Sequence, residues 1–505
     1  MFMRYLRAPL LLLGLAAFVA GCDITDLDIN TDPNAATSAP PNLLFPTVLV
    51  NIASNRAMEI SPTTTMFAQI WSANGSTGVF YTPERYTVSP NTTNNVWLSF
   101  FSTSLRNLSL TTRDALAATP APQLNTAAQA QIMAAYIFLT ATQLWETIPY
   151  TEATNGTAFP NPKSDPQEVV LRGLVLKLDS AVAQINAAAQ DTVIARLDPQ
   201  GRGAITTGDL VYRGNMQSWV RFANSLKLRT LMLIRNKDTG VDAQIRALLA
   251  QPLIRTNAQE AVVPFFTTAG NENNVWKLND LFGGFTDAKN GNGFLFAGKP
   301  LVDLMTELGD PRLDTYFELP VAWCEDPVDY ASDVHVGQEA GVQNYCEPVS
   351  MVHQNIIRRD WPSRMVTAAE VWLFEAEFLA STGNLADAYT SYRTGVQLAL
   401  DYFDGKPGAI APTAKQAYLV GLPASFTSQQ QALEAIWAQE YIEVFDRAPE
   451  NWTHWRRTKS PELPLAVQAV LPNIIRRFPF SIAEETSNPN APKPVAFDQP
   501  MWFEK

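Results

Sequence analysis

Five side chains in one stretch of the sequence carry groups that could recognise a polar ligand with an apolar face. The stretch "WSANGSTGVFYTPERY" contains Trp71, Asn74, Tyr81, Arg85 and Tyr86. Aromatic rings stack on the C–H face of a sugar, while amide and guanidinium groups hydrogen-bond its hydroxyls. We therefore predict that this stretch lines a ligand site. For each ring taken alone, packing over a helical core is the alternative.

Other segments rich in Asn, Gly, Ser, Thr and Pro also contain aromatic residues. Trp276 and Trp323 lie in such segments, and we predict that both contribute to the ligand site. Loops of this length inside a compact protein are usually functional or disordered, and aromatic content argues against disorder. We place loop-rich insertions at 72–95 and 255–365.

Residues for catalysis are sparse. The three histidines, His335, His353 and His454, have no neighbour at metal-ligand spacing. The sequence contains no G-x-S-x-G, P-loop or G-x-G-x-x-G motif. Paired carboxylates for glycoside hydrolysis stay open, because 49 acidic residues offer many pairs and the spacing that matters is spatial. We predict a binding protein with no catalytic residue and no cofactor.

The N-terminus has the pattern of an export signal. Arg4 and Arg7 precede an apolar stretch, 10–19, that is too short to span a bilayer. It ends in "VAGC", which resembles the lipobox of bacterial lipoproteins and implies cleavage before Cys22 followed by acylation of that residue. We assign 1–21 to a signal peptide and 22–40 to an acylated N-terminus and linker. A plain secretory signal is the alternative.

The acidic residues after Cys22 resemble a calcium loop only in part. Asp26, Asp28, Asn30 and Asp32 alternate as oxygen ligands would. An EF-hand needs Gly at its sixth position and Glu at its twelfth, whereas counting from Asp26 gives threonine at both. A solvated linker is favoured, and a structural calcium ion is the alternative.

The two remaining cysteines, Cys324 and Cys346, lie in one segment of a chain predicted to be exported. Because exported proteins meet oxidising conditions, we predict a disulfide between them. Such a bond would close a loop of about twenty residues and stabilise the fold by about 3 kcal/mol.

Charge and composition exclude some partners. The net charge is −12 with 37 basic residues and no basic run, which argues against nucleic acid. Hydrophobic residues make up 46% of the chain, enough for a large core. No stretch after the signal reaches the length of a membrane span.

Helical periodicity dominates wherever a pattern is clear. Amphipathic stripes run through 132–139, 165–185, 219–233 and 433–444, with Asp165 as the expected cap of the second. One helix is predicted to end at Gly383 and the next to begin at Asn384, which resembles a tetratricopeptide unit. We interpret "ENWTHWRRT" (450–458) as a structural helix whose arginines pair with acids. The predicted fold is mainly α, a curved scaffold of helix pairs with a loop-rich ligand-binding face over 41–505.

Nine segments follow one another in a characteristic order along the chain. They are the lipobox, "DINTDPN" (28–34), "LFPTVLVN" (44–51), "IPYTEA" (148–153), "SWVRFANSLKLRTLMLI" (218–234), "DPRL" (310–313), "AEVWLFEAE" (369–377), "IWAQEYIEVF" (436–445) and "ENWTHWRRT" (450–458). In this order the segments resemble the SusD/RagB lipoproteins, and the closest branch is the SusD-like type 2 group. The specificity lies in the order of the segments.

The resemblance implies a helical lipoprotein of the outer-membrane surface. It implies a SusC-like TonB-dependent barrel as partner, to which captured nutrient is delivered. An oligosaccharide is the expected ligand, and a peptide is the alternative. A helical-repeat scaffold without a small ligand and a glycosidase lipoprotein are the other classes that stay open.

Overall fold

The computed structural model describes residues 39–73, 81–197, 203–281, 295–320, 332–343 and 348–504. Within these ranges the chain from Pro41 onward forms one compact unit. Five residues with predicted roles lie outside the described residues: Cys22, Asn74, Trp323, Cys324 and Cys346. The lipid anchor, the disulfide and the contribution of two ligand residues therefore stay predictions.

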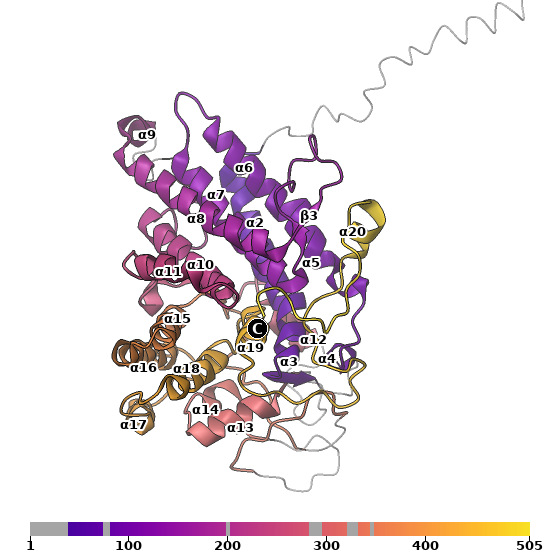
Figure 1. Cartoon of the computed structure of the whole chain (residues 1–505), viewed down its shortest axis with the longest axis vertical. Coiled ribbons are helices and arrows are strands. Elements are labelled where there is room, and N and C mark those ends of the chain that lie inside the picture. The colour runs from indigo at the N-terminus through magenta and orange to yellow at the C-terminus, as the bar shows by residue number, and fades with distance from the viewer. Residues whose placement is uncertain are drawn as a thin grey trace, which may run out of the picture. The chain divides into compact units, whose positions relative to one another are not determined.

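Long antiparallel helices form the first half of the unit, and in Figure 1 they occupy its upper part. Helix α7 packs against α6 on one side and α8 on the other, and α8 packs in turn against α10. The apolar stripe at 132–139 is buried on α7, as its period predicts. The elements are α2 (Pro41–Asn55), η2 (Arg56–Ile60), α3 (Ser61–Phe67), η4 (Ser99–Leu105), α6 (Arg106–Leu116), α7 (Leu124–Trp145), α8 (Gln167–Gln190), α10 (Met216–Arg235) and α11 (Asp242–Leu249).

A second group of paired helices follows later in the chain. Helix α15 packs along α16 and also contacts α18 and α10, which joins the two groups. The turn between α15 and α16 is as predicted, because Gly383 adopts a left-handed φ of 88° and the Asn384 side chain accepts a hydrogen bond from Asp387 N. The elements are α15 (Ala368–Ser381), α16 (Leu385–Asp401), α17 (Pro412–Gly421), α18 (Gln429–Glu443) and α19 (Glu450–Thr458).

Three short antiparallel sheets of two strands each occur in the described chain, and two of them join segments that are distant in sequence. Strand β1 (Trp71–Ala73) pairs with β5 (Leu295–Ala297), with Trp71 opposite Ala297 and Ala73 opposite Leu295. Strand β2 (Ile148–Pro149) pairs with β3 (Ser164–Asp165). Strand β4 (Ala261–Val263) pairs with β6 (Ser363–Val366).

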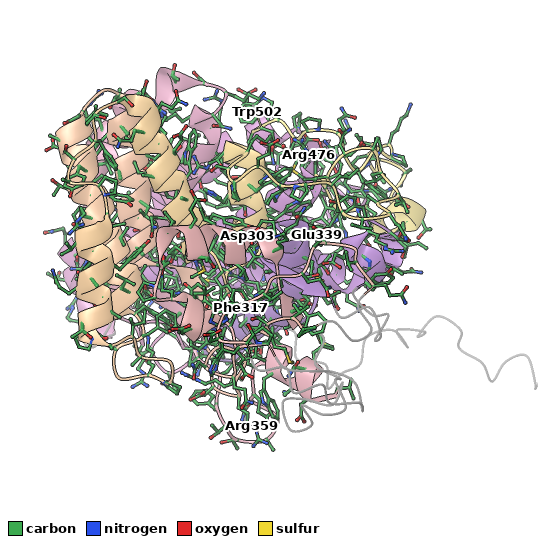
Figure 2. The ribbon with its side chains drawn as sticks, turned by 90° about the horizontal axis from the view of Figure 1, so that it is seen from below. Asp303, Phe317, Glu339, Arg359, Arg476 and Trp502 are labelled. Carbon is green, nitrogen blue, oxygen red and sulfur yellow. The ribbon has the colours of Figure 1, made fainter. Side chains whose placement is uncertain are left out.

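The segments predicted as loop-rich contain several short helices. Figure 2, viewed from below, looks onto them beside the upright helices α15, α16 and α18, with Asp303, Phe317, Glu339 and Arg359 labelled. The remaining elements are α4 (Tyr81–Glu84), η3 (Pro90–Thr93), α5 (Asn94–Leu98), α9 (Thr192–Leu197), η5 (Thr239–Val241), η6 (Asn257–Gln259), α12 (Asn274–Leu281), α13 (Lys299–Leu308), α14 (Leu313–Tyr316) and α20 (Ile482–Ser487).

The described elements thus confirm a mainly α fold built on helix pairs. The prediction for Asp165 is wrong: Pro166 precedes the first residue of α8, and the Asp165 carboxylate instead accepts hydrogen bonds from the backbone N of Tyr150 and Thr151 at 3.2 and 2.8 Å. That carboxylate therefore ties down the segment that follows α7.

Candidate functional site

Four segments that are distant in sequence meet around β1 and β5. Gly298, directly after β5, forms a bridge with Gln338, and Phe296 on β5 forms one with Met351. Gly298 N also donates to Ile70 O at 3.0 Å. The predicted ligand residues on β1 and α4 therefore lie beside segments from the second loop-rich insertion.

Trp71 is buried on β1, with 2% of its surface exposed. Its ring meets Phe445 edge-on at 5.8 Å. It also lines a cavity of about 40 Å³, together with Asn273 and Trp361, which is room for a water molecule. In the described chain, Trp71 Nε1 has no hydrogen-bond acceptor.

Tyr81, Arg85 and Tyr86 lie together on and just after α4. The Arg85 guanidinium carbon lies 4.1 Å from the centre of the Tyr81 ring, and Arg85 Nε donates to Gly341 O at 3.1 Å. The Tyr81 hydroxyl is buried and unpaired among the described residues. Tyr86 is packed against Phe67, and burial raises the pKa of its hydroxyl to about 12.

Two residues that sequence reasoning missed complete this cluster. Glu84, on α4, is 1% exposed and accepts a hydrogen bond from Ala73 N at 3.2 Å. Burial raises the pKa of Glu84 to about 7, against hydrogen bonds that lower it. Gln338 Nε2 donates to Ser72 Oγ at 2.9 Å and to Ala73 O at 2.8 Å. Both side chains therefore fix the end of β1.

We call Trp71, Tyr81, Glu84 and Gln338 the β1 cluster. Each member has one buried polar atom without a hydrogen-bond partner in the described ranges, namely Trp71 Nε1, Tyr81 Oη, Glu84 Oε2 and Gln338 Oε1. An unsatisfied buried polar group costs about 1–3 kcal/mol. Native structures rarely leave such groups unpaired, and hydrogen bonds to a bound ligand would satisfy them. The cluster offers both donors and acceptors.

Trp276 lies on α12, close to the same region. Its ring is half-buried, with the Arg359 guanidinium carbon 4.4 Å from the ring centre. The preceding residue, Val275, lines the cavity that Trp71 also lines. The structure therefore places Tyr81, Arg85 and Tyr86 on and after α4, which Glu84 links to β1, while Trp71 on β1 and the neighbour of Trp276 line one cavity. Their role in ligand binding stays a prediction.

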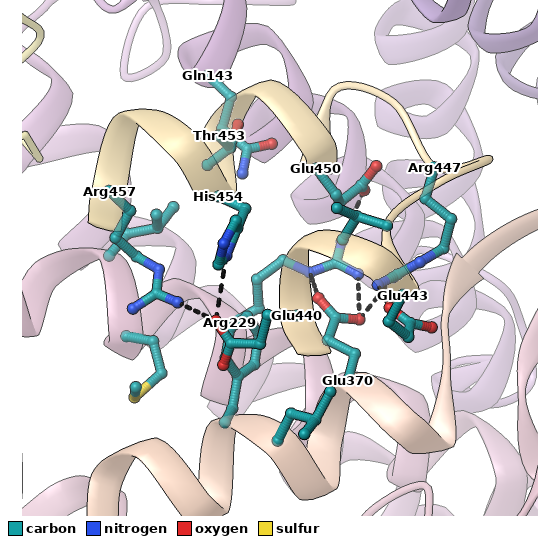
Figure 3. A pocket seen from close by; sticks show the side chains of 15 residues that line it. Gln143, Arg229, Glu370, Glu440, Glu443, Arg447, Glu450, Thr453, His454 and Arg457 are labelled. Carbon is teal, nitrogen blue, oxygen red and sulfur yellow. Dashed lines mark hydrogen bonds and ion pairs between the residues drawn. The ribbon is translucent and has the colours of Figure 1, made fainter. Parts of the chain in front are cut away.

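Carboxylates suited to acid–base chemistry occur in the described chain, but inside the helical core. Figure 3 shows Arg229 and Arg447 directed at Glu370, and Arg457 and His454 directed at Glu440. Arg229 Nη1 also donates to Glu450 Oε1 at 2.9 Å, and His454 Nδ1 lies 3.1 Å from Glu440 Oε2. These residues surround a cavity of about 30 Å³ and are nearly inaccessible to solvent.

Electrostatics inside this ionic core is set by burial and by pairing. Burial opposes ionisation of Glu370, but the charges of Arg229 and Arg447 outweigh it and lower the pKa of Glu370 to about 2. Burial and the neighbouring Glu377 raise the pKa of Glu440. Burial and Arg457 lower the pKa of His454. Each of these perturbed groups lies beside an ionisable partner inside the core, so burial and pairing explain its pKa shift.

The ionic core draws residues from several of the segments on which the family resemblance rests. Arg229, Glu370, Glu440 and Arg457 come from four different segments of that series. The interpretation of "ENWTHWRRT" as structural holds, since Trp452 is fully buried and Arg457 pairs with Glu440 at 2.7 Å. The acid pairing predicted for Arg456 is wrong, because its Nη1 donates to the Arg476 carbonyl at 2.7 Å.

No group of three or more His, Cys, Asp or Glu side chains in the described ranges is arranged to hold a metal ion. The acidic stretch 26–34 lies outside them. Among the described helices, none combines the length and apolar character needed to cross a bilayer.

The paired helices and the loop-rich segments define the class as a helical-repeat protein. A family model described as "Starch-binding associating with outer membrane" (SusD-like) matches residues 33–480, and the chain belongs to this family. The resemblance seen in the sequence is therefore confirmed.

Solved structures confirm the fold. A Bacteroidetes SusD-like protein superposes with a TM-score of 0.75 at 18% identity, covering 92% of this chain and 100% of its own. A chitin-binding protein gives 0.70 at 20% identity, covering 89% and 94%. A SusD homologue from Bacteroides uniformis gives 0.70 at 21% identity, covering 92% and 99%. A search of curated protein sequences finds no match.

Proposed function

We propose that this protein captures an oligosaccharide at the face around β1 and β5 and delivers it to a SusC-like TonB-dependent transporter. It acts as a binding protein, without cleaving its ligand. The observation that carries the proposal is the β1 cluster, in which each of four residues on or beside β1 has one buried polar atom without a partner in the described ranges, in a member of a family described as starch-binding.

An oligosaccharide fits the chemistry of this face better than a purely apolar ligand does. Sugar hydroxyls both donate and accept, so they match the indole N–H, the phenol and the carboxyl and amide oxygens of the cluster. The fold neighbour named as chitin-binding supports the same ligand class. The peptide alternative stays an outcome of the experiment below.

Attachment to the outer membrane would keep the protein at its transporter. Acylation of Cys22 tethers the chain, and tethering raises the effective concentration of the lipoprotein at the mouth of the barrel. The energy for import would come through the transporter, since no nucleotide-binding motif occurs in the sequence. Family membership supports outer-membrane association.

The proposal is tested by ligand capture. A soluble form lacking residues 1–22 is incubated with malto-oligosaccharides, chito-oligosaccharides and a peptide mixture, and the retained compounds are identified by mass spectrometry. Retention of one intact oligosaccharide class is the expected result. Retained peptides would show that the ligand is a peptide and not an oligosaccharide. Cleaved products would indicate an enzyme. If no compound is retained, a scaffold protein without a small ligand would be favoured.

A further inference from the structure

A second cleft, which shares no lining residue with the β1 cluster, lies between α6, α7 and α8. It has a volume of about 570 Å³, which is in the range of small-ligand sites. Its apolar surface includes Leu108 and Phe138, and the Tyr150 ring meets Phe138 edge-on at 5.0 Å. Its polar lining is rich in hydroxyl and amide groups: Ser109, Thr112, Gln131, Thr154 and Ser180.

The charge in this cleft is positive. Its lining includes Arg113 and Lys177 and no carboxylate among the described residues. Arg113 pairs with its exposed neighbour Asp114. Lys177 forms no hydrogen bond or ion pair within the described chain, and its Nζ lies 5.9 Å from the centre of the Tyr150 ring. Burial lowers the pKa of Lys177. Because the half-buried Lys177 ammonium has no counter-charge beside it, an anion bound here would be stabilised.

The position of Tyr150 depends on a glycine in the middle of α8. A Cβ atom on Gly173 would lie 2.5 Å from Tyr150 Cε1, so no larger residue allows the ring to rest there. Glycine inside a helix is unfavourable by about 0.5–1 kcal/mol relative to alanine. The close approach of Tyr150 is the compensating contact, and it forms one wall of the cleft.

Backbone strain occurs at the rim. Thr154 adopts a φ of 65°, which is rare for a β-branched residue. Thr154 lines this cleft and also a neighbouring one of about 400 Å³ that contains Trp97, Phe101 and Phe159. Strained residues concentrate at ligand sites, where the surrounding structure holds them in place.

We propose that the cleft between α6, α7 and α8 binds an acidic sugar unit. Its carboxylate or phosphate pairs with Lys177, its apolar face rests on Tyr150 and Phe138, and its hydroxyls bond the serine and threonine side chains. The site is separate from the β1 cluster, so its failure would leave the proposed function intact.

An acidic sugar could come from two sources, a free uronate-bearing oligosaccharide or the phosphorylated sugar headgroup of a membrane lipid. Trigalacturonate and vesicles containing lipopolysaccharide are therefore both used as probes. Galactotriose and vesicles of phosphatidylcholine alone are their uncharged counterparts. Binding is measured by calorimetry for the free sugars and by co-sedimentation for the vesicles, with the soluble form lacking residues 1–22.

Lys177→Met is the test variant and Lys237→Met the control, because Lys237 is an exposed lysine with the same charge. We expect at least one acidic probe to bind the wild type, with affinity reduced about tenfold or more in Lys177→Met and unchanged in Lys237→Met. Binding of trigalacturonate assigns the free oligosaccharide, and binding of lipopolysaccharide vesicles alone assigns the lipid headgroup. The proposal is overturned if no acidic probe binds, if the uncharged counterparts bind equally well, or if Lys177→Met binds like the wild type.

Discussion

Arg229 on α10 and Glu370 on α15 form a two-pronged ion pair inside the protein, with Nε–Oε1 and Nη2–Oε2 distances of 2.7 Å each. Glu370 is held at this point because the Thr367 hydroxyl accepts a hydrogen bond from Glu370 N at 3.2 Å, which caps α15. The pair joins the helix groups that carry the loop-rich face.

Replacing Glu370 should strongly destabilise the fold. Glu370→Gln leaves Arg229 and Arg447 without their shared negative charge, and breaking a buried pair costs about 3–5 kcal/mol. Denaturant unfolding measures the loss. Glu168→Gln is the control, since its partner Arg172 lies in an exposed ion pair at 2.9 Å. A loss no larger than that of the control would contradict the structural role of the ionic core.

The low pKa of the Glu370 carboxylate predicts that the protein loses stability in acid. The folded-state pKa of Glu370 is about 2, below the ordinary value of 4.5. Its contribution is therefore present above pH 4.5 and is lost as the pH falls towards 2. The stability difference between wild type and Glu370→Gln should shrink over that window. A difference that is constant with pH would show that ionisation of Glu370 is not the cause.

Glu84 should make the stability of the protein depend on pH in the opposite direction, with a loss as the pH rises. Its folded-state pKa of about 7 exceeds the ordinary 4.5, so the stability it contributes is present below pH 4.5 and is lost as the pH rises through 7. Glu84→Gln removes this dependence, because the amide does not ionise. Unfolding free energies at about pH 5 and about pH 8 should therefore fall with pH in the wild type more than in the variant. Equal slopes would refute the raised pKa.

Gly298 should tolerate no side chain. A Cβ atom there would lie 2.0 Å from the Gln69 carbonyl oxygen, so Gly298→Ala must displace β5 from its contact with the segment before β1. We expect lower thermal stability and weaker ligand binding. Gly156→Ala is the matched control, because its Cβ would meet nothing within 4 Å. Similar behaviour of both variants would mean that the contact is not required.

Membrane attachment should depend on one cysteine. Cys22→Ala removes the acylation site, so the protein should move from the membrane fraction to the soluble fraction after export. Cys324→Ala is the control and should stay membrane-bound. Membrane retention of Cys22→Ala would rule out the lipid anchor.

The helical scaffold could be predicted because its signals are local. The apolar period at 132–139 and the Gly383–Asn384 turn each depend on neighbours within a few residues. The cap predicted at Asp165 was wrong because local sequence does not separate a helix cap from a residue that binds a preceding loop. The hydrogen bond from Thr151 N to the Asp165 carboxylate shows which role it has.

The β1 cluster could be predicted only in part. The stretch 71–86 could be singled out because three aromatic residues and an arginine lie close together in it: Trp71, Tyr81, Tyr86 and Arg85. Gln338 could not be found, because its contact with Ser72 joins residues 266 positions apart. Glu84 gave no signal either, since an acid in a polar loop is ordinarily solvated, and its burial follows from tertiary packing alone.

The most direct test of ligand capture at the β1 cluster is the affinity of Tyr81→Phe and Trp71→Phe for the retained oligosaccharide. Both variants keep a ring for packing and remove one polar atom that is unpaired in the described chain. We predict that folding stability is unchanged or higher in Tyr81→Phe and lower in Trp71→Phe, whose smaller ring leaves a void in the core, while the oligosaccharide binds about tenfold more weakly in each. Unchanged affinity in both variants would contradict capture at this cluster.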